Sequence, residues 1–167
     1  MTARQLNITT EKEQLAKQVE LFFNDLVLLT KDIPPFLNER VERINLIRSK
    51  TYEKTNQLQH RSLLIRIVEH FISQQVDINL WTWHPEQSSD ENYADITGFK
   101  DEKIILNIEA TTSSKAIGKP RLQMKKTLAS LNSKQGKKYY FVQTTEMYNS
   151  ALRTVKTENY DITVEKI

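Results

Sequence analysis

The sequence predicts an α/β or α+β domain in which helices flank a central sheet, preceded by two further helices. Apolar residues at helical spacing and strand-like runs succeed one another along the chain. From residue 59 onward their order is helix, three strands, helix, strand, helix, strand, which is typical of a sheet covered by helices. A length of 167 residues suits one domain with a sizeable core. We therefore divide the chain into an N-terminal helical extension packed on the core, 1–58, and the core itself, 59–167.

The extension is predicted to be a helical hairpin. A helix over residues 10–31 begins with a capping box, Thr10-x-x-Glu13, and continues with an apolar stripe at helical spacing. The stripe consists of Leu15, Val19, Phe22, Leu26 and Leu29. Two consecutive prolines end this helix, and a second apolar pattern over residues 36–47 predicts an antiparallel partner. We interpret the hairpin as a layer on the core, with a dimerisation or partner-binding arm as the alternative.

The core is predicted to begin with a helix that a polar patch over residues 50–59 separates from the hairpin. Its strands alternate polar and apolar residues or form short runs rich in β-branched and aromatic side chains. Gly118 and Pro120 mark the start of a later helix, and Gly136 is assigned to its C-terminal cap. In chain order we predict a helix at 59–75, strands at 76–84, 93–99 and 104–111, a helix between 118 and 136, a strand at 139–142, a helix at 146–156 and a strand at 162–167.

The composition excludes several kinds of site. The chain has no cysteine, which excludes a disulfide framework and thiolate-bound zinc, and its three scattered histidines do not form a histidine-rich metal site. No segment approaches the ~18 uninterrupted apolar residues of a transmembrane helix, and the N-terminus lacks the apolar run of a signal peptide. The sequence therefore predicts a cytoplasmic protein without a membrane partner.

Two acidic residues lie inside apolar strand patterns. Asp95 belongs to the predicted strand 93–99 and Glu109 to the strand 104–111, and the turn between these strands is short enough for a hairpin. The hairpin would place the two carboxylates on neighbouring strands. Carboxylates brought together repel each other unless they share a cation, and Mg²⁺ prefers oxygen ligands of this kind. The pair therefore predicts a site for a divalent cation.

A basic band follows directly after the second acid. Residues 113–138 contain seven Lys, one Arg and no acid. The basic residues are Lys115, Lys119, Arg121, Lys125, Lys126, Lys134, Lys137 and Lys138. An acidic pair beside such a band indicates a polyanion held against a metal ion. Contacts of this kind bind phosphate and carry no base information, so they fit RNA as well as DNA.

The element order and the two acids resemble the PD-(D/E)xK nuclease superfamily, which has the restriction-endonuclease-like fold. The resemblance covers residues 59–167: Asp95 resembles the family's Asp, and Glu109 the acid of its Glu-x-Lys motif. Glu69 resembles the extra Glu that many members carry on the first core helix. The resemblance implies a mixed sheet and a DNA endonuclease dependent on Mg²⁺, with Mn²⁺ as a substitute. The implied metal ligands are Asp95, Glu109, the backbone carbonyl of Ala110 and, for a second ion, Glu69.

Thr111 stands where the family has its lysine. A neutral hydroxyl cannot supply the charge with which that lysine orients water and stabilises the phosphate. Our first interpretation is that another cation takes this catalytic role, and Lys115, in the loop after the strand, is preferred to Lys125. The alternative is a catalytically inactive nuclease-fold protein that binds nucleic acid or acts as an assembly subunit.

Overall fold

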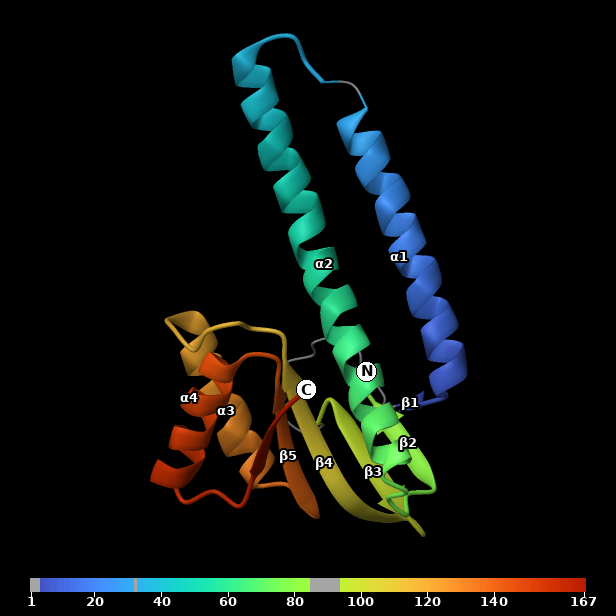
Figure 1. Cartoon of the computed structure of the whole chain (residues 1–167), viewed down its shortest axis with the longest axis vertical. Helices are drawn as coiled ribbons and strands as arrows, with labels where there is room; N and C mark the ends of the chain where they lie inside the picture. Colours follow the sequence, from blue (N-terminus) through green and yellow to red (C-terminus); the bar gives the residue numbers. More distant parts are fainter. Residues whose placement is uncertain (1–3, 32, 85–93) are drawn as a thin grey trace.

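A computed structural model describes residues 4–31, 33–84 and 94–167 of the chain. Within these ranges the protein is α+β, with a six-stranded sheet in the order β1-β2-β3-β4-β5-β6 and a helical hairpin that projects from it (Figure 1). The helices are α1 (Ile8–Thr30), α2 (Leu37–Ser73), α3 (Lys119–Asn132) and α4 (Thr145–Thr157). The strands are β1 (Arg4–Gln5), β2 (Leu80–Trp83), β3 (Ile96–Lys100), β4 (Lys103–Thr111), β5 (Lys137–Val142) and β6 (Thr163–Lys166).

The sheet is mixed. Strands β1 to β4 pair antiparallel, whereas β4, β5 and β6 run parallel and are connected through α3 and α4. The predicted order of core elements is confirmed. The two-residue strand β1 was not predicted, and the strand expected over residues 76–84 is shorter, since β2 covers only its second half.

The predicted hairpin between the second and third core strands is confirmed. Lys100 of β3 pairs with Lys103 of β4 across a two-residue turn. Asp101 and Glu102 in this turn have φ values of 48° and 64°, the left-handed conformation that two-residue hairpin turns require. Tyr93, the first residue of the strand predicted before this turn, lies outside the described residues.

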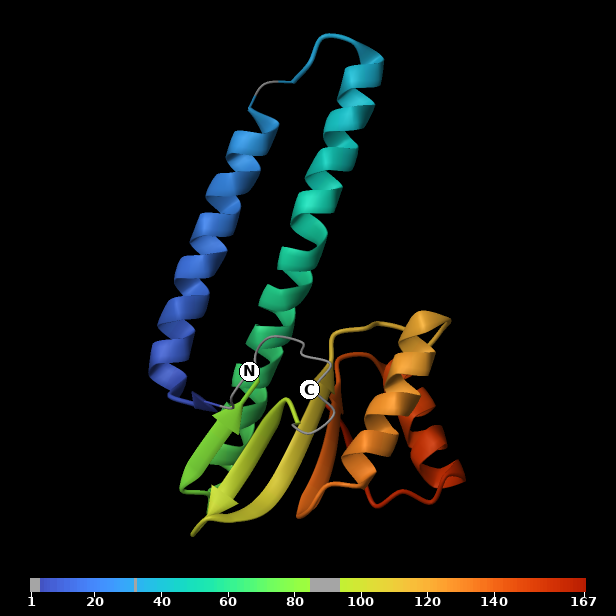
Figure 2. The same cartoon turned by 180° about the vertical axis from the view of Figure 1, so that it is seen from behind.

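Helices cover both faces of the sheet, as Figures 1 and 2 show. The C-terminal half of α2 packs on one face in an apolar cluster that includes Leu106 and Ile108 of β4. Helices α3 and α4 pack on the other face, in a cluster with Tyr140 and Val142 of β5. Because side chains of a strand alternate between its faces, Glu109, which follows Ile108, points toward the α3 side.

Helix α2 is continuous, which corrects two predictions. The helices expected over residues 36–47 and 59–75 are parts of one helix of 37 residues, about 55 Å long. The polar patch between them contains neither Gly nor Pro, so it marks the point where the helix leaves the apolar core and not a break in the helix. The boundary predicted between residues 58 and 59 therefore falls inside α2.

Two predicted caps are also corrected. Helix α1 begins at Ile8, and its N-cap is Asn7, whose Oδ1 accepts a hydrogen bond from Thr10 N at 3.1 Å. Thr10 therefore lies within the first turn and does not start a capping box. Helix α3 ends at Asn132, ahead of Gly136. Gly136 has φ 72°, and a Cβ there would lie 2.6 Å from the carbonyl oxygen of Ile105, so this glycine lets the start of β5 approach β4.

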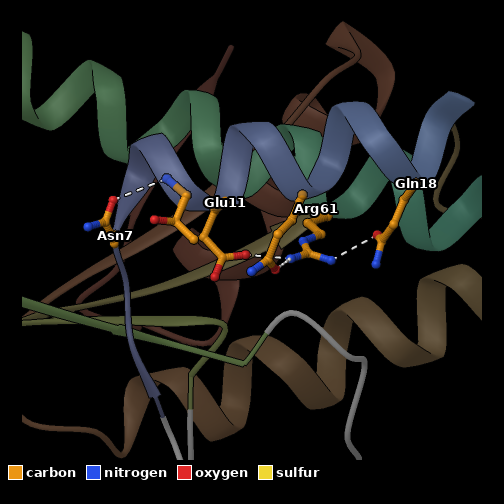
Figure 3. Close-up of polar contacts among 6 residues, drawn as sticks. Asn7, Glu11, Gln18 and Arg61 are labelled. Carbon is orange, nitrogen blue, oxygen red and sulfur yellow. Dashed lines mark hydrogen bonds and ion pairs between the residues drawn. The ribbon is translucent and has the colours of Figure 1, made fainter.

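A buried ion pair fastens the base of the hairpin to the core (Figure 3). Arg61 of α2 donates a short hydrogen bond to the carboxylate of Glu11 in α1. The same guanidinium donates to Gln18 at 2.9 Å and to Gln14 at 3.1 Å, and it lies 5.3 Å from the ring centre of Trp83 in β2. The base of α1 is therefore held against both α2 and the sheet.

In the described ranges, no helix is both long enough and apolar enough to cross a bilayer.

Candidate functional site

A cleft of about 680 Å³ opens beside the C-terminal end of β4. Its walls are formed by α2, the loop after β4 and the first half of α3. Its lining residues are Tyr52, Asn56, His60, Asp95, Glu109, Ala110, Thr111, Thr112, Ser113, Ser114, Lys115, Ile117, Pro120, Gln123, Met124, Thr127 and Tyr140. The wall is rich in hydroxyl groups, and both predicted acids lie in it.

Asp95 and Glu109 meet in this cleft, as the sequence predicts. Ile96 of β3 pairs with Ile108 of β4, so Asp95, one residue earlier, lies level with Glu109. The two carboxyl groups are hydrogen-bonded to each other. Asp95 Oδ2 also accepts a hydrogen bond from the backbone N–H of Ala110 at 2.8 Å. The β3–β4 pairing thus fixes two carboxyl groups side by side at the edge of the cleft.

The surroundings of Glu109 favour its protonated form. Burial raises its pKa well above the ordinary value, and the charge of Asp95 and the hydrogen bond between the two carboxyls raise it further. The positive charge of Lys134 acts in the opposite direction. The pair therefore retains a proton at a pH where an isolated Glu has lost it. A cation bound between the carboxyls would do what this proton does, because it would relieve the same repulsion.

His60 is a member of the site that the sequence analysis missed. Its Nε2 lies 3.4 Å from Asp95 Oδ1, and its side chain is only 3% exposed. Burial alone would lower the pKa of His60, but the charge of Asp95 and its hydrogen-bonding contact outweigh this effect, so the net pKa is raised. Neither ring nitrogen has a well-aligned hydrogen bond within the described part of the chain. A lone His on a helix gives no spacing signal by which it could have been found.

Tyr140 and Thr111 close the floor of the cleft. Tyr140 of β5 pairs with Glu109 of β4 in the sheet and is almost fully buried. Burial, together with the charges of Glu109 and Asp95, raises the pKa of Tyr140, while its hydrogen bond with Thr111 opposes this. Thr111 Oγ1 also accepts a hydrogen bond from Ser113 N at 3.2 Å. The Thr111 hydroxyl therefore holds the start of the loop and is neutral, as the sequence indicates.

The cations near the pair differ from those that the sequence favoured. Lys115 lines the cleft, with Nζ 3.8 Å from Glu146 Oε2, and both side chains are more than half exposed. Lys125 is exposed on α3 and is not among the lining residues. Lys134, which the sequence assigned only to phosphate binding, is the lysine whose charge acts on Glu109. It lies in the turn between α3 and β5, a place that only the tertiary fold sets beside the acids.

Glu69 lies away from the site. Its Oε1 pairs with Lys12 Nζ of α1 at 2.8 Å, and it is not among the residues of the cleft. Glu69 follows His60 by nine residues on α2. This offset corresponds to about 13 Å along the helix axis and to two and a half turns, so the two side chains point to opposite sides of α2. The structure therefore does not bring Glu69 to the pair, and in the described ranges no three His, Cys, Asp or Glu side chains cluster in a way that could hold a metal.

The basic band is divided between two places. Lys119, Arg121, Lys125 and Lys126 are exposed on α3, beside the cleft. Lys137 and Lys138 belong to the start of β5, further from the carboxyl pair, and Lys138 Nζ lies 3.4 Å from Asp161 Oδ2. Of the whole band, only Lys115 is among the residues that line the cleft.

No family model, curated protein or solved structure matches the chain. What the cleft can do therefore follows from its own geometry.

Proposed function

We propose that the protein is a metal-dependent nuclease that hydrolyses phosphodiester bonds in DNA. One observation carries the proposal: the carboxyl groups of Asp95 and Glu109 lie together in a cleft that Lys115 also lines. The resemblance to the PD-(D/E)xK superfamily supports it, because the core has the same element order, Glu109 lies on β4 and Asp95 directly precedes β3. We extend the proposal to a restriction-endonuclease-like core on the same grounds.

The donor set fits a hard divalent cation such as Mg²⁺ or Mn²⁺. Asp95, directly before β3, and Glu109 and the carbonyl oxygen of Ala110, both on β4, would hold it, since all three supply oxygen ligands. When bound, the ion supplies a water of lowered pKa and neutralises charge on the phosphate. Glu109 must release its proton for this, and the positive charge of Lys134 favours that release.

The chain's own residues have separate roles in the proposal. His60, held against Asp95, fixes the orientation of that carboxylate. Lys115, in the cleft wall, is the cation that would stabilise charge on the phosphate in place of the missing motif lysine. Lys134 is not among the lining residues, but its charge acts on Glu109, so it is the second candidate. The exposed residues Lys119, Arg121, Lys125 and Lys126 would contact the DNA backbone.

A second function is favoured by one observation, the neutral Thr111 at the motif position. Its hydroxyl is engaged by Tyr140 and by Ser113 N, so it contributes no charge to the cleft. If neither lysine replaces that charge, the same surface binds nucleic acid without cleaving it.

Cleavage assays separate the two functions. Supercoiled, linear and single-stranded DNA are incubated with Mg²⁺, Mn²⁺ or EDTA, for the parent and for Asp95→Asn, Glu109→Gln and Glu69→Gln. The proposal expects metal-dependent cleavage that both cleft variants lose by a factor of about 10³ or more, because each removes a metal ligand. Glu69→Gln is the matched control and should cut like the parent, since Glu69 lies outside the cleft.

Binding without cleavage in any metal would replace the nuclease with the binding function. Equal cleavage by the parent and both cleft variants would show that another site is responsible.

A further inference from the structure

The hairpin leaves a row of large apolar side chains exposed. Eight Phe, Val, Leu or Ile residues of its two helices are at least half exposed, and five of these eight form the row. They are Phe23 at 60%, Val27 at 63%, Leu37 at 74%, Val41 at 50% and Ile44 at 63%. Exposed apolar surface of this extent on a protein is typical of an interaction site.

The five residues share one side of the hairpin. The inward stripe of α1 includes Phe22 and Leu26, and Phe23 and Val27 each follow a member of it by one position. On α2, Ile44 likewise follows the partly buried Arg43, and Val41 and Leu37 precede it by one and two turns. In an antiparallel pair of helices, the positions that follow the inward residues lie on the same side of the pair. These residues therefore form one apolar face, which we call the hairpin face.

The two helices carry opposite charges. Helix α1 has two lysines and four acids, whereas residues 37–57 of α2 have five basic and three acidic residues. A second hairpin stacked face to face, with its α2 over this α1 and its α1 over this α2, brings opposite charges together twice. A two-fold axis parallel to the helices produces this arrangement, and every helix then has antiparallel neighbours.

We propose that the hairpin face is a homodimer interface, and that two copies of the chain form an antiparallel four-helix bundle. The same face serves both copies, as a two-fold axis requires, and the charge pattern complements itself. The axis along the bundle places both clefts at the same end of the dimer. The proposal does not depend on the activity of the cleft.

Sedimentation or light scattering of the full chain tests the interface. The parent should have about twice the mass of one 19.6 kDa chain at micromolar concentration. Val41→Glu with Ile44→Glu should weaken the dimer by about a hundredfold or more, because the interface would bury carboxylates. Leu21→Glu with Leu28→Glu is the matched control: these residues are 51% and 68% exposed but precede the inward positions, on the opposite side.

The fold of each variant is checked by tryptophan fluorescence. Both tryptophans lie in β2, buried in the core, so their emission reports on the core independently of the hairpin. A monomeric parent would overturn the proposal. So would loss of the dimer in the control pair with an unchanged dimer in the test pair.

Disulfide cross-linking tests the orientation, and the absence of native cysteine makes it clean. Lys54 Nζ and Asp25 Oδ2 lie 3.1 Å apart, so the turn of α2 that contains Tyr52 lies beside the turn of α1 that contains Val27. Chains with Val27→Cys mixed with chains with Tyr52→Cys should form a mixed disulfide dimer. A Val27→Cys dimer with itself, without the mixed species, would show α1 against α1 and overturn the charge-paired arrangement.

Discussion

Two glutamates of the molecule, one buried and one half-buried, have opposite surroundings. Glu11, at the base of the hairpin, faces the guanidinium of Arg61, which also donates to two glutamine side chains. Glu109, in the cleft, faces a second carboxyl group, and its charge is opposed by burial and by Asp95. A buried acid with a matched cation fastens two elements together, whereas a half-buried acid beside another acid is a cost that folding alone does not explain. Such an arrangement is typical of a functional site.

The anchor should respond most strongly to losing its cation. Arg61→Met leaves Glu11 buried without its partner, and this should lower the free energy of unfolding by about 3–5 kcal/mol. Urea unfolding measured by tryptophan fluorescence gives the value. The double variant Arg61→Met with Glu11→Leu should recover most of that loss, because it removes both charges. If the single variant is as stable as the parent, the ion pair does not fasten the hairpin.

Removing a cation near the cleft should reduce cleavage activity more than it reduces the stability of the fold. Lys115→Ala and Lys134→Ala, made singly, should each be compared with the parent in metal-dependent cleavage. The lysine that replaces the motif lysine should cost a factor of about 10²–10³ in rate, since preorganised charge stabilisers have effects of this size.

Thr111→Lys complements this comparison. This change should raise cleavage strongly only if neither Lys115 nor Lys134 already replaces the motif lysine. Lys156→Ala, which removes an exposed lysine of α4, is the control for the two alanine variants. Parent-like rates for Lys115→Ala and Lys134→Ala would exclude both lysines.

The pH dependence of stability should distinguish the two glutamates. The pKa of Glu109 is raised in the folded protein, so the unfolded chain loses this proton first as the pH rises. The stability of the parent should therefore fall between the ordinary pKa of Glu and the raised value. Glu109→Gln should remove this fall and be more stable above that window, by about 1 kcal/mol per unit of pKa shift removed.

Adding Mg²⁺ gives a second test of the proton on Glu109. Binding between the carboxyls displaces the proton, so the increase in melting temperature with Mg²⁺ should grow as the pH rises and should vanish in Glu109→Gln. An Mg²⁺ effect that is independent of pH would place the ion elsewhere.

The smallest effect is expected from removing exposed lysines of α3. Lys125→Ala with Lys126→Ala should weaken DNA binding similarly for all sequences and flatten its log–log salt dependence by roughly one unit per lost phosphate contact. Titrations at several salt concentrations measure the slope. An unchanged slope would show that these lysines are only solvated residues of α3.

Local sequence patterns predicted whatever depends on residues close together in the chain. The order of core elements and the meeting of Asp95 with Glu109 followed from periodicity and a short turn. The continuity of α2 was missed because a polar segment looks the same whether a helix ends or leaves the core. Glu69 was misplaced because its phase on α2 depends on which side of the helix faces the sheet. His60 and Lys134 come to the acids through tertiary packing, and no spacing in the sequence encodes that.

The unbroken course of α2 has a mechanical consequence. Tyr52, Asn56 and His60, which form one wall of the cleft, follow one another at intervals of four residues on the same rod that carries Val41 and Ile44. Residues 37–73 contain neither glycine nor proline, so the helix has no built-in hinge between these groups. The cleft wall and the tip of the hairpin are therefore parts of one rigid element, joined over about 25 Å. Arg61, next to His60, fixes the lower part of that element against α1 and Trp83, so the direction in which the hairpin projects from the cleft is set at its base.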